Sequence, residues 1–299
     1  MFKLPYRGRF APSPTGPLHA GSLLAAFGSW LLARQAGGQW LVRIEDVDPP
    51  REVPGAAQQQ LQTLAAFGLH ADGEVVLQSQ RSAHYQQALD TLLASGQAFE
   101  CHCSRSALAA TQGIHRRCVN THTRPDPAIR LRVPEGCVMH FNDAVFGRYQ
   151  QRVDSAVGDF VLRRSDGLWA YQLAVVVDDA LQGISHVVRG ADLLDSTPRQ
   201  ILLQQALALP TPSYTHLPLL LDASGKKLSK SSAALPVDSA QPQAVLRRLW
   251  GYLGQPPLPS TNTLEAFLNL AALRFQADKI PTQVRPVCAA HNTIITTRA

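Results

Sequence analysis

The sequence has no long hydrophobic run and little cysteine, and both shortages narrow the class of protein. No apolar stretch reaches the roughly 20 residues that span a bilayer. The longest, near residues 22–33, contains Gly28 and Ser29 and is better explained as a buried helix. The N-terminus lacks the apolar core and cleavage site of a signal peptide, and no internal repeat or low-complexity tract occurs. We therefore expect a cytoplasmic protein, in which the 5 cysteines are metal ligands or buried thiols rather than disulfide partners.

Basic residues outnumber acidic ones, and the excess is concentrated in one region. The 299 residues include 28 Lys and Arg against 22 Asp and Glu, which gives a net charge of +6. Residues 101–164 contain ten Arg but five Asp or Glu. A cationic surface of this kind is typical of proteins that bind a polyanion such as nucleic acid, and a solvated face without a ligand is the alternative. With 45% hydrophobic residues, the chain is long enough for a buried core and two domains.

Alternating strand and helix patterns predict an α/β fold. The expected strands cover residues 7–11 and 39–46, and the expected helices cover 19–34, 55–67, 82–95 and 195–209, with Ser82 as a helix cap. The apolar segment 170–179 is either a strand or a helix. This order predicts a doubly wound, parallel sheet of the Rossmann type.

An insertion and a helical tail are expected to interrupt and follow this sheet. Residues 99–151 are rich in Arg and Pro, so we expect them to form an insertion in a main domain that spans 1–238. Nucleotide-fold character resumes at residue 158. Residues 239–299 are expected to form a small helical C-terminal part, with a loose tail after residue 280, where no periodicity is visible.

A strand, a Pro/Gly loop and a helix follow one another in residues 7–22. The N-terminus of a helix presents free N–H groups and a positive dipole end, and it therefore attracts phosphate. His19 would lie in the first turn, where it can donate to a phosphate oxygen, and Gly21 leaves room for a nucleotide. Residues 225–232 read Gly-Lys-Lys-Leu-Ser-Lys-Ser-Ser. Each stretch alone is explained as well by an ordinary turn or a solvated basic loop, but the pair in this order is much rarer by chance.

Three thiols and one imidazole predict a zinc site of the closed, four-coordinate type. Eleven residues separate Cys-His-Cys from His-Arg-Arg-Cys, and the expected ligands are Cys101, Cys103, Cys118 and His115. His102 and His122 compete with His115, and the alternative to a metal site is three unconnected cysteines that pack as small apolar side chains. A structural zinc would stabilise an insertion too small to be stable by burial alone. Cys137 and Cys288 are isolated and expected to be inert.

Polar residues at the ends of the predicted core elements describe a possible ligand pocket, because ligands bind at the ends of parallel strands in such folds. They are Arg9, Ser13, Glu45, Tyr171 and Arg189. Two guanidiniums and a carboxylate suit an acidic amino acid, with the arginines facing its carboxylates and Glu45 its ammonium group. For each residue alone, a solvated strand end is the alternative.

Several motifs, in order over roughly residues 5–275, resemble the glutamyl-tRNA synthetase catalytic domain: Arg9-Phe-Ala-Pro-Ser-Pro-Thr-Gly, Arg43-Ile-Glu-Asp, Val177-Asp-Asp, Val188-Arg-Gly-Ala-Asp and Lys227-Leu-Ser-Lys-Ser. His19-Ala-Gly-Ser22 resembles the other signature of class I aminoacyl-tRNA synthetases, with Ser22 in place of the usual second histidine. The chain stops where glutamyl-tRNA synthetases continue into an anticodon-binding region. With its Cys-x-Cys…Cys insertion, it resembles the truncated glutamyl-queuosine tRNA(Asp) synthetase family.

The resemblance implies an activity and a set of site residues. That family activates glutamate with ATP, without tRNA, and transfers it to the queuosine base at the wobble position of tRNA(Asp). The implied glutamate site is Arg9, Phe10, Ala11, Pro12, Ser13, Glu45, Tyr171 and Arg189. The implied ATP site is Pro12, Thr15, Gly16, His19, Gly21, Ser22, Lys227, Leu228, Ser229, Lys230 and Ser231, with His19, Lys227 and Lys230 as catalytic residues. The family's zinc ligands are three Cys and a Tyr, and His115 stands near that Tyr with one residue fewer before Cys118.

The expected partners are therefore ATP with Mg²⁺, L-glutamate and queuosine-containing tRNA(Asp), with no membrane, and the expected oligomeric state is a monomer. Two alternatives stay open. One is a short glutamyl-tRNA synthetase that charges a tRNA 3′ end. The other is a non-catalytic tRNA-binding paralogue, which Ser22 allows and the retained His19 and lysines disfavour.

Overall fold

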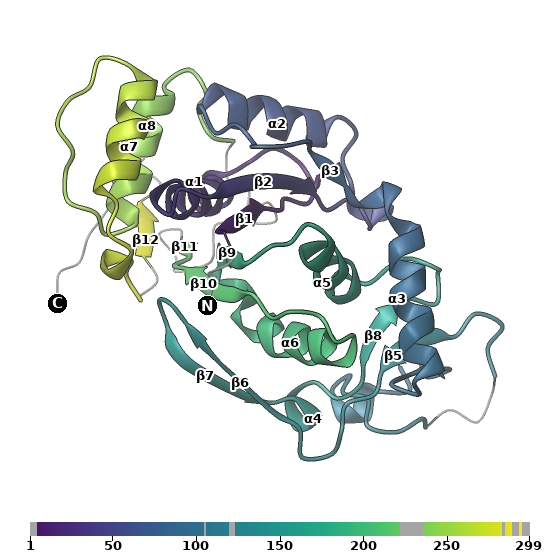
Figure 1. Cartoon of the computed structure of the whole chain (residues 1–299). Helices are drawn as coiled ribbons and strands as arrows, with labels where there is room; N and C mark the ends of the chain where they lie inside the picture. Colours follow the sequence, from purple (N-terminus) through teal and green to yellow (C-terminus); the bar gives the residue numbers. More distant parts are fainter. Residues whose placement is uncertain are drawn as a thin grey trace.

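A seven-stranded, mostly parallel sheet lies at the centre of the structure (Figure 1). The structure is a computed structural model that describes residues 5–104, 106–119, 123–221, 236–282, 285–288 and 293–294. The sheet order is β3-β2-β1-β9-β10-β6-β7, and the strands are β1 (Arg7–Phe10), β2 (Gln39–Ile44), β3 (Val76–Leu77), β6 (Val138–Asp143), β7 (Gly147–Arg152), β9 (His186–Gly190) and β10 (Ser213–Leu217). Only the β6–β7 pair is antiparallel within this sheet. The predicted doubly wound sheet is confirmed.

Helices cover both faces of the sheet. They are α1 (Ala20–Gln35), α2 (Ala56–Ala66), α5 (Tyr171–Leu181) and α6 (Thr197–Ala206), whereas α3 (Ser82–Ala94) packs against α5 and a smaller sheet. Side chains alternate between the faces of a strand. In β2, Trp40 and Val42 pack in the cluster that contains α1, whereas Leu41 packs in the cluster that contains Ile201 of α6. The segment 170–179, for which the sequence allowed a strand or a helix, is the helix α5.

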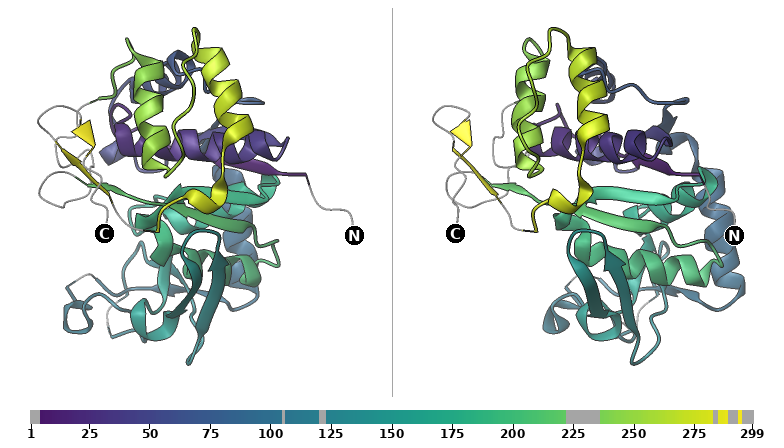
Figure 2. Two further views of the ribbon diagram at one scale, coloured as in Figure 1. Left: turned by 90° about the vertical axis from the view of Figure 1, so that its left-hand side faces the viewer. Right: turned by 60° about the vertical axis from the view of Figure 1, so that its left-hand side comes forward.

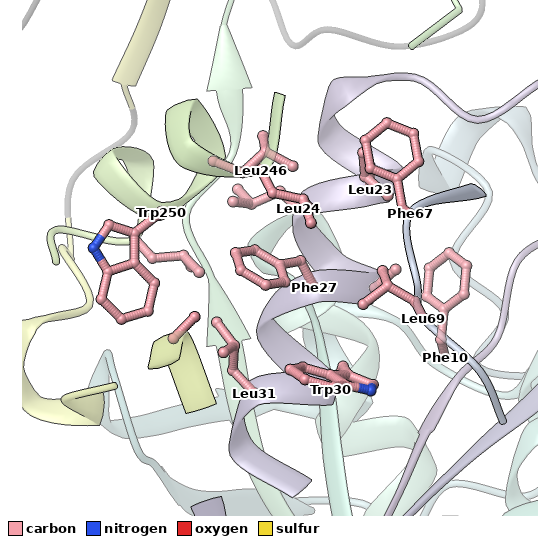
Figure 3. Close-up of a cluster of buried hydrophobic side chains, with 14 of the residues drawn as sticks. Phe10, Leu23, Leu24, Phe27, Trp30, Leu31, Phe67, Leu69, Leu246 and Trp250 are labelled. Atoms are coloured by element: carbon pink, nitrogen blue, oxygen red, sulfur yellow. The ribbon is translucent and has the colours of Figure 1, made fainter. Parts of the chain in front are cut away.

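The largest hydrophobic cluster joins α1 to two C-terminal helices, α7 (Pro242–Tyr252) and α8 (Leu264–Arg274) (Figure 2). Phe27 and Leu31 of α1 lie near Leu246 and Trp250 of α7 (Figure 3). Each such side chain contributes about 1.5–3 kcal/mol when it is fully buried. Gly28 lets α1 approach β10, because a Cβ there would lie 2.6 Å from Leu217 Cδ1. The helical C-terminal part is therefore packed against the first helix of the nucleotide fold.

The region between α3 and α5 divides between two sheets. A small antiparallel sheet consists of β4 (Ala98–Cys101), β5 (Ala128–Leu131) and β8 (Phe160–Arg163). The β6–β7 hairpin instead extends the main sheet, since β6 pairs with β10 through Asp143 and Tyr214. The short helix α4 (Val153–Ala156) connects the hairpin to β8. The prediction that nucleotide-fold character resumes at residue 158 is wrong, because the pairing of β8 with β5 places it in the small sheet.

Other expectations need correction. Ser82 is the first residue of α3 and not its cap, and its Oγ accepts a hydrogen bond from Trp169 Nε1 at 3.2 Å. The helix expected at 195–209 is a 3₁₀ helix, η4 (Ala191–Ser196), followed by α6. The tail is not structureless: β12 (Arg285–Cys288) pairs with β11 (Leu220–Leu221) and with β13 (Thr293–Ile294). Backbone pairing between distant segments leaves no local periodicity, so sequence patterns cannot indicate it.

The remaining short helices are of the 3₁₀ type: η1 (Pro49–Arg51), η2 (Gln78–Gln80), η3 (Ala109–Thr111) and η6 (Ala277–Lys279). Within the ranges that the structure describes, none of the helices has the length and hydrophobicity needed to cross a membrane.

Candidate active site and metal cluster

A cavity of about 820 Å³ opens where the C-terminal ends of β1 and β9 meet the N-terminus of α1. Parallel strands bring their carboxyl ends to one edge, which is where ligands bind in such sheets. Every residue of the implied glutamate site lines this cavity: Arg9, Phe10, Ala11, Pro12, Ser13, Glu45, Tyr171 and Arg189. From the implied ATP site, Pro12, Thr15, His19, Gly21 and Ser22 line it and Gly16 does not. Lys227, Leu228, Ser229, Lys230 and Ser231 lie outside the described residues.

His19 is the N-cap of α1. Its Nδ1 accepts hydrogen bonds from the backbone N–H groups of Gly21 at 3.1 Å and Ser22 at 3.2 Å. Two of the N–H groups that we expected to be free are therefore bonded to the imidazole, which corrects the simple picture of an open helix N-terminus. Because Nδ1 accepts, the neutral ring carries its proton on Nε2, which lies 3.0 Å from Ser22 Oγ. Ser22 thus contacts His19 at the position where the family has a second histidine.

Arg189 presents a guanidinium without a carboxylate partner. Its Nη1 donates to Tyr171 Oη at 3.3 Å, its Nη2 to Thr197 Oγ1 at 2.8 Å and to the Leu193 carbonyl oxygen at 3.4 Å, and its Nε to His216 Nε2 at 3.2 Å. Arg189 is 6% exposed, and it takes part in none of the ion pairs found in the described part of the chain. A nearly buried cation held by uncharged groups is a strong site for an incoming carboxylate.

Arg9 and Glu45 belong instead to a buried ionic network. Asp179 accepts from Arg9 through both carboxylate oxygens, and its Oδ1 also lies 2.8 Å from Arg43 Nη1. Arg43 Nη2 reaches Glu45 Oε1 at 3.3 Å. Burial raises the pKa of Asp179, but the two guanidiniums outweigh burial and hold this pKa below its usual value. Burial raises the pKa of Glu45 despite Arg43 and Arg9. Asp178, the neighbour of Asp179, accepts from residues in and before α3: Gln78, Arg81 and Tyr85.

Asp179 and Arg43 are site-supporting residues that the sequence did not single out by role. Both stand in quoted motifs, Val177-Asp-Asp and Arg43-Ile-Glu-Asp. The signal that could have found them is the occurrence of charged residues within apolar segments, because a buried charge needs a partner. The partner itself lies 136 residues away in sequence.

The four predicted metal ligands come together in space. The ligand atoms of Cys101, Cys103, His115 and Cys118 all lie within 4.8 Å of one another. Burial and the two neighbouring thiols raise the pKa of Cys118 to about 11, since thiolates this close repel each other. A cation would remove that repulsion, so the cluster could hold a metal ion.

The position of His115 supports this. Its Nδ1 lies 2.9 Å from Asp159 Oδ2, while its buried Nε2 has no hydrogen-bond partner within the described part of the chain. An imidazole whose one nitrogen is held by a carboxylate leaves the other available to a metal. Gly158 permits the close approach, because it has φ +68° and a Cβ there would lie 2.1 Å from the His115 carbonyl oxygen. Of the competing histidines, His102 accepts from the Arg124 N–H at 2.9 Å through Nδ1, and His122 lies outside the described residues.

Comparison with known proteins defines the class. The model of the family described as tRNA synthetases class I (E and Q), catalytic domain, matches residues 6–256. The chain therefore belongs to the class I tRNA synthetases of this family, which are ligases.

Two curated relatives narrow the comparison. The Glutamyl-Q tRNA(Asp) synthetase of Xanthomonas campestris pv. campestris (strain 8004) is 62% identical over 283 residues, which cover 94% of this chain and 95% of that protein. The protein of the same name from Neisseria meningitidis serogroup A / serotype 4A (strain DSM 15465 / Z2491) is 50% identical over 288 residues, with 92% and 97% covered.

Solved structures agree with this. A crystal structure of a glutamate tRNA ligase from Elizabethkingia meningosepticum CCUG26117, in complex with its amino acid, matches with a TM-score of 0.79 at 27% identity. The match covers 94% of this chain and 66% of that chain. A glutamate-tRNA synthetase from Elizabethkingia anophelis matches with a TM-score of 0.81 at 26% identity and coverages of 96% and 69%.

Proposed function

We propose that this chain activates glutamate with ATP, without tRNA, and transfers the glutamyl group to the queuosine base at the wobble position of tRNA(Asp). The observation that carries the glutamate part is the guanidinium of Arg189 in the cavity wall, which has no carboxylate partner among the described residues. The proposed acceptor is supported by the name of two relatives, Glutamyl-Q tRNA(Asp) synthetase, whose alignments cover 92–94% of this chain.

Glutamate would lie between Arg189 and the network of Arg9 and Glu45. Arg189 would bind one carboxylate through the Nη1 N–H that Tyr171 does not accept. The Nε and Nη2 atoms of Arg9 are bonded to Asp179, so its Nη1 is the atom left for a substrate carboxylate. Glu45 would accept from the ammonium group, whose positive charge favours the ionised form of this carboxyl.

ATP would occupy the part of the cavity lined by His19, Gly21 and Ser22. The glutamate α-carboxylate attacks the α-phosphorus of ATP, the bond from the α-phosphorus to the oxygen bridging to the β-phosphate breaks, and pyrophosphate leaves. Mg²⁺ would accompany ATP and neutralise phosphate charge. Catalysis then rests on positioning and on charge stabilisation. We assign the latter to His19, Lys227 and Lys230. The two lysines lie between Leu220 and Pro236 in the sequence, outside the described residues. Leu220 lines the cavity, and Pro236 forms an isolated β-bridge with His19.

The acceptor chemistry follows from the nucleoside. Queuosine carries a cyclopentene diol that resembles the ribose diol esterified by other synthetases. Arg116, Arg117 and Arg124 are exposed beside the metal cluster and would contact phosphates of the anticodon arm. Arg105, expected in the same role, lies outside the described residues.

We further propose that the metal is one structural Zn²⁺, held by Cys101, Cys103, His115 and Cys118. Three sulfur atoms and one imidazole nitrogen are the donor set of closed zinc sites. The ion would connect β4 to the segment before the β5 strand and so stabilise the insertion.

Amino-acid-dependent ATP–pyrophosphate exchange tests the activation step. We expect exchange with glutamate in the absence of tRNA, and a loss of most of it in Arg189→Ala. Arg274→Ala, on the exposed surface of α8, is the matched control and should exchange normally. Exchange that appears only with tRNA(Glu) would instead favour a short glutamyl-tRNA synthetase, and no exchange would favour a binding paralogue.

A further inference from the structure

Behind Arg189, two buried residues that do not line the cavity form a chain of hydrogen bonds to its guanidinium. We propose that His216, itself held by Asp143, is the positioning residue that fixes Arg189 for the substrate carboxylate. The inference rests on the proposed function, in which Arg189 binds glutamate. His216 stands on β10 and Asp143 ends β6, so the chain of bonds crosses three neighbouring strands to Arg189 on β9.

The geometry of His216 is fully constrained. The imidazole has no exposed surface. Its Nδ1 lies 2.6 Å from Asp143 Oδ2, and the same oxygen accepts the His216 backbone N–H at 3.0 Å. On the other side of the ring, Nε2 lies 3.2 Å from both Arg189 Nε and Thr197 Oγ1.

These contacts determine where the proton lies. A guanidinium nitrogen only donates, so Nε2 must accept from Arg189 and must be unprotonated. Nδ1 therefore carries the proton and donates it to Asp143. Burial and the positive charge of Arg189 lower the pKa of His216, although Asp143 raises it, and the neutral ring that the geometry requires is the favoured form.

Asp143 is in turn held by the turn of the β6–β7 hairpin. Its Oδ1 accepts the backbone N–H groups of Val145 and Phe146, both at 2.9 Å. Both oxygens of the Asp143 carboxylate therefore accept hydrogen bonds, Oδ1 from the hairpin turn and Oδ2 from His216. The hairpin that extends the main sheet is in this way connected to the candidate glutamate site.

The consequence for Arg189 is a fixed guanidinium plane. Arg189 and His216 are direct partners in the register of β9 and β10. His216 accepts the Nε–H, Tyr171 accepts one N–H of Nη1, and Thr197 Oγ1 and the Leu193 carbonyl oxygen accept from Nη2. Without His216, the Nε edge of the guanidinium loses its only side-chain acceptor among the described residues, while the bonds of the two terminal nitrogens remain. Even a small misplacement of a substrate-binding group is costly. His216 therefore acts on glutamate through Arg189 and does not touch the substrate.

A matched pair of variants separates the two sides of the ring. In His216→Gln, the amide oxygen can reach the place of Nε2 and accept from Arg189. In His216→Asn, the shorter amide can replace Nδ1 and donate to Asp143, but nothing reaches Arg189. We expect the KM for glutamate to rise at least tenfold in the Asn variant and less than threefold in the Gln variant, with the KM for ATP unchanged in both. His84→Asn, exposed on α3, is the control.

Equal glutamate KM values in the two variants, or parallel increases in the KM for ATP, would overturn the role of His216. If the variants do not fold, ¹⁵N NMR of the imidazole in the unmodified protein decides: a proton on Nδ1 is expected, and a proton on Nε2 contradicts the inference. Unmodified protein that catalyses no glutamate-dependent exchange would overturn the proposed function itself. Active protein with indistinguishable variants overturns only the positioning role.

Discussion

Arg9 and Asp179 form a bidentate ion pair, with Arg9 Nε 3.0 Å from Oδ1 and Arg9 Nη2 3.1 Å from Oδ2. Their side chains are only 3% and 8% exposed. The pair joins β1 to α5 and leaves one terminal nitrogen of Arg9 for a ligand. Asp179 therefore supports the cavity wall from behind, in addition to its bond with Arg43.

Replacing Asp179 should damage both stability and glutamate binding. Asp179→Asn leaves two buried guanidiniums without their shared carboxylate, and losing one member of a buried ion pair typically costs about 3–5 kcal/mol. Urea unfolding should show this loss, and the glutamate KM should rise because Arg9 is no longer held. Asp166→Asn, whose side chain is 47% exposed beside Arg164, is the control and should change neither quantity. Normal stability of Asp179→Asn would mean that the network contributes little.

The amino-acid specificity should depend on Arg189. A site built around an unpaired guanidinium leaves that group unsatisfied when an uncharged ligand binds, so glutamine should be strongly rejected. Arg189→Ala should raise the glutamate KM more than any other single change in the cavity. Arg189→Lys should recover little, because an ammonium cannot make the same directed bonds. Pyrophosphate exchange with both amino acids checks this, and comparable rates with glutamine and glutamate would count against the assignment.

Metal content tests the cysteine cluster. Elemental analysis of freshly purified protein should find one zinc per chain, and Cys118→Ser should lose it. Asp159→Asn should weaken zinc binding by about 10–100-fold in a chelator competition, because the carboxylate orients the ligand His115. Cys137→Ser, outside the cluster, should retain the metal. Full zinc content in Cys118→Ser would show that the ligands are wrong even if the metal is present.

Acid should destabilise the protein through the His216–Asp143 pair. The pKa of His216 is lowered from 6.5 in the fold, first by burial, so the unfolded chain binds its proton more readily. The neutral His216 ring therefore contributes its full stabilisation above about pH 6.5, and this contribution is lost as the pH falls toward the lower pKa of His216 in the folded protein. The charged groups that act on the ring are Asp143, Arg189 and Asp192, and the ring also contacts Thr197 and the Tyr214 ring.

The pKa of Asp143 is also lowered from 3.8: burial raises it, but the bonds from His216 and from two backbone N–H groups outweigh burial. The contribution of Asp143 therefore disappears at still lower pH. Urea unfolding between pH 4 and pH 8 should show a smaller pH slope near pH 6 in His216→Gln than in the unmodified protein. An unchanged slope would assign the acid sensitivity to other groups.

Local patterns predicted the parts of the site that are continuous in sequence. The strand, Pro/Gly loop and helix of residues 7–22 lie within one short stretch, and the four predicted metal ligands, from Cys101 to Cys118, lie within another. In these cases the spacing of residue types is itself the chemical signal. The helix α5 was ambiguous because a largely apolar segment that ends in two acids, residues 170–179, suits either a buried strand or a buried helix.

The partners of buried polar groups could not be predicted in this way. Arg189 and His216 are 27 residues apart, and Asp143 is 73 residues from His216. They meet because β6, β10 and β9 are neighbours in the sheet, and strand order is a property of the whole chain. The same reason explains why the β6–β7 hairpin, expected in the insertion, belongs to the main sheet, and why β8, expected in the nucleotide fold, belongs to the small sheet.

The acceptor is the central claim, and the position of labelled glutamate on the tRNA tests it most directly. Purified protein, ATP and labelled glutamate would be incubated with tRNA(Asp) that contains queuosine but lacks its 3′-terminal adenosine. We predict that nuclease mapping finds the label in the anticodon fragment, and that it disappears when the tRNA carries guanosine at the wobble position or when periodate has first cleaved the queuosine diol. Equal labelling of queuosine-free tRNA, or label that requires the 3′-terminal adenosine, would contradict the account and favour a short glutamyl-tRNA synthetase.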